Sequence, residues 1–140
     1  MQPRPFVRAD IPAAQRLSRE AGWPQRAEDW EFALSLGAGW AVEDAEGLAA
    51  TLLIWRHGPR HASMGMVLVA GRVQRRGIGR VLGDLALFEL AGRTILLNAT
   101  GPGERLYRQL GFRRHATIVQ HQGAEARLAP LAPARGERLR

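Results

Sequence analysis

The sequence has 140 residues and contains neither cysteine nor lysine. The absence of cysteine excludes disulfide bonds, thiolate metal ligands and a cysteine nucleophile. The absence of lysine excludes the phosphate-binding P-loop, whose motif requires that residue. No apolar run approaches the ~20 residues that a membrane span needs, and the N-terminus lacks the apolar core of a secretory signal. We therefore expect a cytoplasmic protein that does not contact a membrane.

Positive charge is abundant and is carried entirely by arginine. The chain has 20 arginines against 13 acidic residues, a formal net charge of +7. Such a balance favours an anionic partner. Charge alone does not choose among nucleic acid, a phosphate-bearing cofactor and an acidic protein. The planar guanidinium group suits phosphate better than a point charge does. Arg72, Arg75, Arg76 and Arg80 crowd one short stretch, and this clustering is more informative than the total charge.

The length fits one domain, which we place at residues 1–123, followed by a tail rich in alanine, proline and arginine at 124–140. We expect the tail to be an edge strand or a linker. Hydrophobic periodicity predicts, in chain order, a strand at 5–10, helices at 11–21 and 25–36, strands at 39–44, 48–57 and 62–69, a helix from 78 to about 92, a buried strand at 93–100, a short helix within 101–112 and a strand at 113–122. This order indicates an α+β fold with an antiparallel meander and a strand–helix–strand crossover.

Two local features refine this pattern. Asp10 is placed to cap the first helix. The helix that begins at residue 78 is expected to bury one face, made of Ile78, Val81, Leu82, Leu85 and Phe88.

The junction "VLVAGRVQRRGIGR", residues 67–80, leads from a strand through glycines and arginines into a helix. A helix N-terminus presents unpaired N–H groups and the positive end of the helix dipole, and Gly77 and Gly79 let the backbone approach an anion closely. The junction predicts pyrophosphate binding; a tight turn with a solvated basic face is the structural alternative. A dinucleotide fingerprint is disfavoured because hairpins precede the junction and the chain is too short for a doubly wound dehydrogenase.

The junction resembles the acetyl-CoA-binding motif Q/R-x-x-G-x-G/A of the GNAT superfamily of N-acetyltransferases, with Gln74, Gly77 and Gly79 at the defining positions. The segment "LYRQLGF", residues 106–112, resembles the family's later motif. The tryptophan-rich stretch "GWPQRAEDW" is similar to one in the N-terminal domain of bacterial proteins with two tandem GNAT domains. The resemblance implies a mixed, mostly antiparallel sheet of about six to seven strands flanked by about four helices.

The resemblance also implies a binding site for acetyl-CoA as co-substrate. Backbone groups of Val67, Leu68 and Val69 would pair with the pantetheine arm, and the N–H of Val69 would serve the carbonyl oxygen. The pyrophosphate would lie over the turn, whose residues are Gln74, Arg75, Arg76, Gly77, Ile78, Gly79 and Arg80. Asn98 is a further candidate for contact with pantetheine.

Tyr107, the sole tyrosine, matches the family's general acid for the CoA sulfur. An unperturbed tyrosine pKa of ~10 would keep it protonated at neutral pH. The sequence departs from the family at Thr100, at Gly103 and at Ile95, where some peptide-modifying members carry an acidic base. The group that takes the proton from the amine is either a water chain or one of four acids, Glu28, Asp29, Glu31 and Glu43.

The resemblance therefore implies an enzyme that transfers acetyl from acetyl-CoA to a primary amine of a small molecule or peptide by direct attack. The alternative is a catalytically silent regulatory module that binds acyl-CoA. Nucleic-acid binding is disfavoured because the densest basic cluster is already explained by the diphosphate. Scattered histidines and the lack of cysteine predict no metal site. A homodimer stays open, and Trp23 and Trp30 either line the acceptor pocket or belong to the core.

Overall fold

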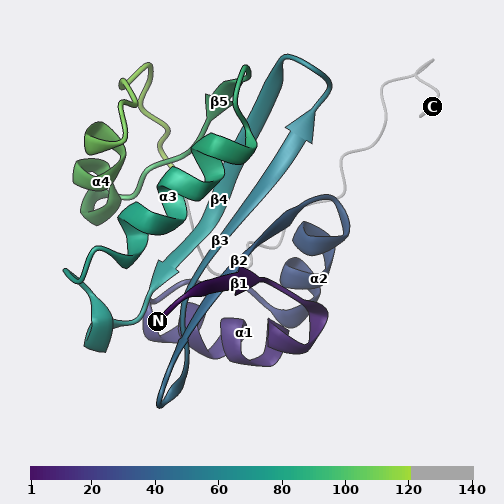
Figure 1. The fold of residues 1–140 in the computed structure, drawn as a ribbon, viewed down its shortest axis with the longest axis vertical. Helices are drawn as coiled ribbons and strands as arrows, with labels where there is room; N and C mark the ends of the chain where they lie inside the picture. The colour runs from purple at the N-terminus through teal and green to yellow at the C-terminus, as the bar shows by residue number, and fades with distance from the viewer. Residues whose placement is uncertain (121–140) are drawn as a thin grey trace, which may run out of the picture.

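The computed structural model describes residues 1–120, so the predicted tail at 124–140 lies outside the described residues. One mixed sheet has the strand order β1-β2-β3-β4-β5 (Figure 1). The strands are β1 (Pro3–Pro5), β2 (Ala38–Asp44), β3 (Gly47–His57), β4 (His61–Val69) and β5 (Thr94–Leu96). The described helices are α1 (Ile11–Glu20), α2 (Ala27–Ser35), α3 (Ile78–Glu89) and α4 (Glu104–Gln109).

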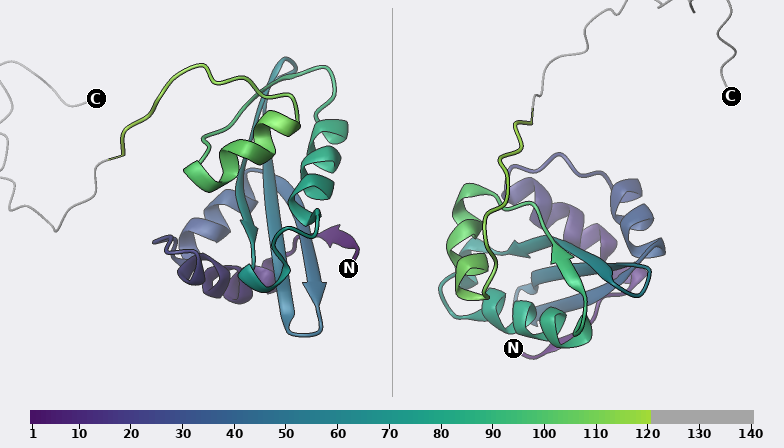
Figure 2. Two further views of the ribbon diagram at one scale, coloured as in Figure 1. Left: turned by 90° about the vertical axis from the view of Figure 1, so that its left-hand side faces the viewer. Right: turned by 90° about the horizontal axis from the view of Figure 1, so that it is seen from above.

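The α+β prediction is confirmed. Strands β1 to β4 pair antiparallel, and α3 makes the crossover that brings β5 parallel to β4. Helices α1 and α2 cover one face of the sheet and α3 covers the other (Figure 2). No helix within residues 1–120 is both long enough and apolar enough to cross a membrane.

The core is centred on β3, where every residue from Ala49 to Ile54 is buried. A strand covered on both faces shows such a continuous apolar run. Trp30 of α2 is completely buried, stacks on Phe6 with ring centroids 5.5 Å apart, and donates its indole N–H to Ser18 Oγ at 3.1 Å. Trp30 is therefore a core residue and does not line an acceptor pocket.

The N-terminal prediction is wrong in detail. Residues 5–10 are not a strand: β1 ends at Pro5, and a short 3-10 turn, Arg8–Asp10, precedes α1. Asp10 occupies the N-cap position of α1, but its side chain makes no capping hydrogen bond to that helix. Its carboxylate instead accepts from the backbone N–H of Val7 at 2.8 Å and from the Arg4 guanidinium at 2.7 and 2.8 Å. Asp10 thus ties β1 to the start of the helical layer.

The predicted apolar face of α3 is also wrong at two positions. Ile78, Leu82 and Ala86 are buried, whereas Val81 is 48% exposed and Phe88 is 81% exposed. A spacing of four residues keeps 78, 82 and 86 on one stripe, and 81 and 88 lie on the stripe beside it.

The C-terminal half has fewer strands than expected. The stretch 93–100 forms only the three-residue β5, with Leu96 61% exposed, so it is not a buried strand. Residues 113–120 contain no strand. Residues 1–120 therefore hold five strands instead of six to seven.

We predict that Asp10→Asn lowers the free energy of unfolding at pH 7 by about 1–3 kcal/mol, because it weakens charge-assisted hydrogen bonds at a side chain that is largely buried. The hydrogen bonds from Arg4 lower the pKa of Asp10 below its usual value. This stabilisation is present above the unfolded-state pKa of ~3.9 and is lost as the pH falls through the folded-state pKa.

Urea unfolding measured from pH 7 down to pH 2 should therefore show the wild-type and Asp10→Asn curves converging at low pH. The control is Asp84→Asn, which removes an exposed i,i+4 pair with Arg80 and should change stability by less than ~0.5 kcal/mol. A difference between wild type and Asp10→Asn that stays constant with pH would contradict the assignment.

Candidate cofactor and active site

Strands β4 and β5 pair at one end only. His61, Ala62 and Ser63 pair with Thr94, Ile95 and Leu96, after which β4 continues to Val69 with no partner on that edge among the described residues. The register of β3 against β4 shifts between Thr51 and Leu53, and Met66 has a positive φ of 50°. A bulge of this kind bends the strand and redirects its edge. The Thr51 hydroxyl fixes it by donating to Met66 O at 2.8 Å.

Backbone groups at the end of β4 face the open edge. The N–H of Ala70 donates to Ala49 O of the neighbouring segment at 2.8 Å. Because successive backbone groups of a strand alternate in direction, the N–H of Val69 points the other way, toward the open edge. The Gln74 side chain lies on this edge, donating from Nε2 to Val69 O at 3.0 Å.

The turn after β4 collects N–H groups without partners. Arg75 and Gly77 have positive φ values of 62° and 78°. Gly77 is the N-cap residue of α3 and, as a glycine, has no side chain to cap the helix. The first helical bond runs from Val81 N to Gly77 O at 3.0 Å, so the N–H groups of residues 78–80 have no partner within the helix. Within residues 1–120, the N–H groups of residues 75–77 donate no hydrogen bond either. The turn can therefore hold an anion.

The four clustered arginines do not act as one group. Arg75 and Arg76 are exposed and make no ion pair with any residue from 1 to 120. Arg80 turns toward Asp84 at 3.0 Å and toward Gln109 O at 3.3 Å. Two of the four side chains thus remain available to an anion at the turn.

Arg72 fastens the turn to the β2–β3 hairpin. Its Nε and Nη2 donate to the Asp44 carboxylate at 2.9 and 3.1 Å, and Nη2 also donates to Leu48 O at 3.2 Å. The hydrogen bond from Arg72 lowers the pKa of Asp44. Because Asp44 neutralises it, Arg72 holds the segment before the turn in place, and its charge is not left for a ligand.

Glycines allow α4 to dock against the start of α3. A Cβ on Gly79 would lie 3.1 Å from Leu106 Cδ2, and one on Gly83 would lie 2.4 Å from Leu110 Cδ1. Leu106, the residue before Tyr107, therefore packs against the first turn of α3. Gly79 is therefore needed for helix packing as well as for access to the backbone.

Tyr107 is 9% exposed and lines a cavity of about 490 Å³. Its ring meets Phe112 edge-on at 6.1 Å, and a Cβ on Gly103 would lie 3.0 Å from the Tyr107 ring, so glycine at 103 gives the ring its space. Burial raises the pKa of the Tyr107 phenol above its usual value. The hydroxyl makes no hydrogen bond with another described residue.

The structure brings some of the predicted site residues together and leaves others apart. Asn98 and Thr100 line the same cavity as Tyr107, whereas no residue of β4 or of the turn is among its lining residues. The lining also includes Glu104, which the sequence reasoning missed and which pairs with Arg108 at 2.8 Å. Its place one helical turn before Tyr107 was the only sign in the sequence.

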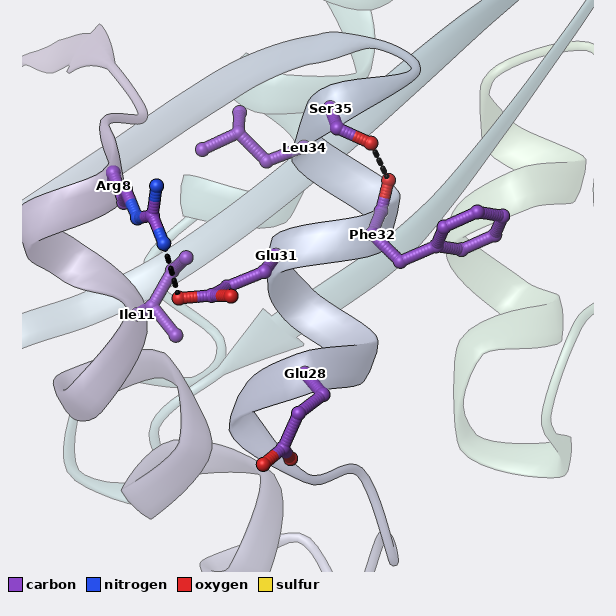
Figure 3. A pocket seen from close by; sticks show the side chains of 7 residues that line it. All are labelled: Arg8, Ile11, Glu28, Glu31, Phe32, Leu34 and Ser35. Carbon is purple, nitrogen blue, oxygen red and sulfur yellow. Dashed lines mark hydrogen bonds and ion pairs between the residues drawn. The ribbon is translucent and has the colours of Figure 1, made fainter.

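The acids considered as a base lie elsewhere. Glu28 and Glu31 line a separate cavity of about 430 Å³ between α1 and α2 (Figure 3). Glu31 pairs with Arg8 at 2.9 Å and Glu43 pairs with Arg4 at 2.6 Å. Asp29 accepts from the N–H of Arg26 at 2.8 Å and so caps α2. None of these four acids lines the cavity of Tyr107.

A metal site has no support within residues 1–120, where no group of three or more histidine, aspartate or glutamate side chains is placed to hold an ion. The candidate site consists of the three features described above: the open β4 edge, the turn before α3 and Tyr107.

Comparison with known proteins shows the fold. No protein-family model matches the sequence, and no curated protein matches it. The structure is similar to a GCN5-related N-acetyltransferase from Ralstonia eutropha, with 21% identity and a TM-score of 0.67 over 86% of this chain and 97% of that one. It is similar to the ribosomal-protein-S18-alanine N-acetyltransferase of Escherichia coli, with 19% identity and a TM-score of 0.71 over 82% of this chain and 79% of that one.

A third similar structure is described as a predicted acetyltransferase with acetyl-CoA, from Clostridium acetobutylicum. It has 17% identity and a TM-score of 0.68 over 86% of this chain and 95% of that one. The described chain therefore has the fold of the GNAT acetyltransferases, as the motif around Gln74 predicts. The similarity to the first domain of tandem proteins stays a prediction.

We predict that Arg72→Ala raises hydrogen exchange at the hydrogen-bonded amides of Val73 and Gln74 by roughly five- to tenfold, because the loss of a charge-assisted hydrogen bond costs about 1–1.5 kcal/mol of local stability. Asp44→Asn should act in the same direction. Arg56→Ala, which removes the exposed pair with Glu89, should leave exchange at Val73 and Gln74 unchanged. Unchanged exchange in both Arg72→Ala and Asp44→Asn would contradict the role of this contact.

Proposed function

We propose that this protein is an N-acetyltransferase that uses acetyl-CoA as co-substrate and acetylates a primary amine of a small molecule or peptide by direct attack. The observation that carries the proposal is the continuity of the open β4 edge with the turn at the start of α3. An extended amide-containing arm can pair with the first, and a diphosphate can bind the second.

The donor sets fit such a ligand. The N–H groups of residues 75–80 and the guanidinium groups of Arg75 and Arg76 would hold the diphosphate. Backbone groups at Val67 and Val69 would pair with the amides of the pantetheine arm, and the neighbouring Leu68, which is 4% exposed, packs into the core. When bound, acetyl-CoA supplies an activated acetyl thioester.

The residues near the thioester would assist the transfer in two ways. The N–H of Val69, directed to the open edge, would donate to the carbonyl oxygen as negative charge develops there. Tyr107 would give its phenolic proton to sulfur as the C–S bond breaks and the new N–C bond forms. The raised pKa of Tyr107 keeps that proton in place at neutral pH.

The amine must lose a proton to attack. Glu104 is the one carboxylate among the residues that line the cavity of Tyr107, and it is paired with Arg108. Because Arg108 already occupies this carboxylate, we propose that water takes the proton.

The pairing of Glu104 also favours a second candidate function, a silent module that binds acyl-CoA without transferring the acyl group. Such a module would retain the turn and the β4 edge, and Tyr107 would serve packing alone. Catalytic measurements on Tyr107 variants separate the two functions.

We predict that the double variant Arg75→Glu, Arg76→Glu weakens acetyl-CoA binding by tenfold or more, or at least ~1.4 kcal/mol, because it replaces two cations beside the diphosphate with anions. Isothermal titration calorimetry at low and high salt measures the effect, which should diminish as salt screens the charges. The control is Arg60→Glu, an exposed arginine before the opposite end of β4, which should bind as wild type does. Equal weakening by Arg60→Glu would reveal a general charge effect and count against the site.

We predict that Tyr107→Phe lowers kcat by about 10²-fold while the Kd for acetyl-CoA stays within twofold, since only proton donation is removed. A thiol-release assay with a panel of primary amines measures kcat. Because burial raises the pKa of Tyr107, the wild-type rate should show no loss from tyrosine ionisation between pH 7 and 9.5. A wild-type protein that binds acetyl-CoA and acetylates no amine would favour the silent module.

A further inference from the structure

One side of α3 is apolar, although no residue from 1 to 120 covers it. Val81 is 48% exposed, Phe88 is 81% exposed, and Leu85 between them is half-buried. Their spacing of four and three residues places the three side chains on one stripe of the helix, here called the α3 stripe. A row of large apolar side chains in contact with solvent indicates a surface that a partner covers.

The α3 stripe faces the part of the sheet that α3 leaves bare. Helix α4 docks on α3 at Gly79 and Gly83. At 3.6 residues per turn, these glycines lie on the side of the helix opposite to Val81 and Phe88. Helix α3 packs on β3 and β4, and Figure 1 and Figure 2 show α4 on one side of it and β1 on the other. The α3 stripe therefore points toward β2 and β1.

The sheet adds apolar surface beside the α3 stripe. Arg56 of β3 pairs with Glu89 of α3, so Leu52, four residues earlier on the same strand, also faces this helix. Trp40 of β2 is the cross-strand partner of Leu52 and shares its face, but it is only half-buried. Exposed Pro5 of β1 lies opposite Trp40. A standard interface buries about 800 Å² per partner, and this part of the sheet extends the area that one helix offers.

The charges that border the α3 stripe are balanced, and this favours a second copy of the chain as the occupant. The chain has a net charge of +7, so two copies repel wherever a basic surface meets its own image. Arg80 pairs with Asp84 on one border of the stripe, and Arg56 pairs with Glu89 on the other. A two-fold interface brings a surface against itself. The α3 stripe can do so without net repulsion.

The other exposed apolar side chains lack this balance. Phe32 lines its cavity together with Glu28, which forms no ion pair with any residue from 1 to 120. Ile118 lines its cavity together with Arg113 and Arg114, and neither arginine pairs with an acid in the described chain. A two-fold dimer through either surface would bring like charges together.

We propose that two copies of this chain form a symmetric dimer in which their α3 stripes pack antiparallel. The two-fold axis would pass near Leu85, so that Val81 of one copy contacts Phe88 of the other. The arginine-rich turn precedes the stripe in each copy, and antiparallel packing places the two turns at opposite ends of the interface. Parallel packing would bring these basic turns side by side and align the helix dipoles unfavourably.

Sedimentation velocity of the full chain from about 1 to 100 µM tests the association, and we expect a monomer–dimer equilibrium in this range. Phe88→Asp should raise the dimer dissociation constant at least ~10²-fold, because the symmetry places two unpaired charges in the interface. Val81→Asp should act in the same direction. The control is Phe32→Asp, which changes an exposed phenylalanine of α2 and should dimerise as wild type does. Circular dichroism and thermal melting establish that each variant is folded.

Cysteine trapping tests the orientation, because the protein contains no cysteine of its own. Val81→Cys and Phe88→Cys proteins are mixed and oxidised mildly, and the disulfide-linked peptides are identified by mass spectrometry. Only side chains that face each other closely form a disulfide. Antiparallel packing predicts that the mixed disulfide between positions 81 and 88 exceeds both the 81–81 and the 88–88 products.

Each of four results would overturn the proposal. A wild type that stays monomeric at every concentration would show that no second copy covers the α3 stripe. A dimer that persists in both Phe88→Asp and Val81→Asp would place the interface elsewhere. Equal dissociation of Phe32→Asp would reveal a general effect of added charge. An excess of 81–81 and 88–88 disulfides would show parallel packing.

Discussion

The separation of β4 from β5 is the constraint on which the rest of the site depends. The bulge at Met66, fixed by the Thr51 hydroxyl, falls after the last pair between the two strands, Ser63 with Leu96. From there β4 keeps β3 on one edge and exposes backbone N–H and C=O groups on the other. A regular strand would satisfy those groups within the sheet and leave nothing to bind an extended ligand.

The elements around this opening are held in place by contacts that are not part of the site. Arg72 ties the start of the turn to the β2–β3 hairpin, and Gln74 ties the turn back to Val69. Leu106 packs where Gly79 has no side chain, so the N-terminus of α3 and the helix that carries Tyr107 form one unit. The positions of the anion-binding turn and of Tyr107 are therefore mechanically linked, although no single cavity contains both.

Local sequence patterns predict the elements whose interactions are local. The hairpin, the glycine turn and the short helix before Phe112 follow from alternation, glycine placement and helical spacing. The errors arise where distant contacts decide. The apolar run at 93–100 looks buried, yet only its first part has a neighbour in the sheet within residues 1–120. The four arginines around the turn form one cluster in the sequence, but Asp44, Asp84 and Gln109 engage two of them. No local pattern encodes those partners, and the same holds for Glu104 beside Tyr107.

Backbone amide NMR during a titration with CoA tests the central claim most directly, because it reports every N–H group at once. The account predicts saturable chemical-shift changes that are largest at residues 67–69 and 75–80, with smaller changes at Tyr107 and at Leu106. The N–H of Arg4, the one backbone amide of β1 on the opposite sheet edge, should not move. Saturable changes centred on α2 or β1, or no changes at millimolar CoA, would contradict the assignment of the β4 edge and the turn as the cofactor site.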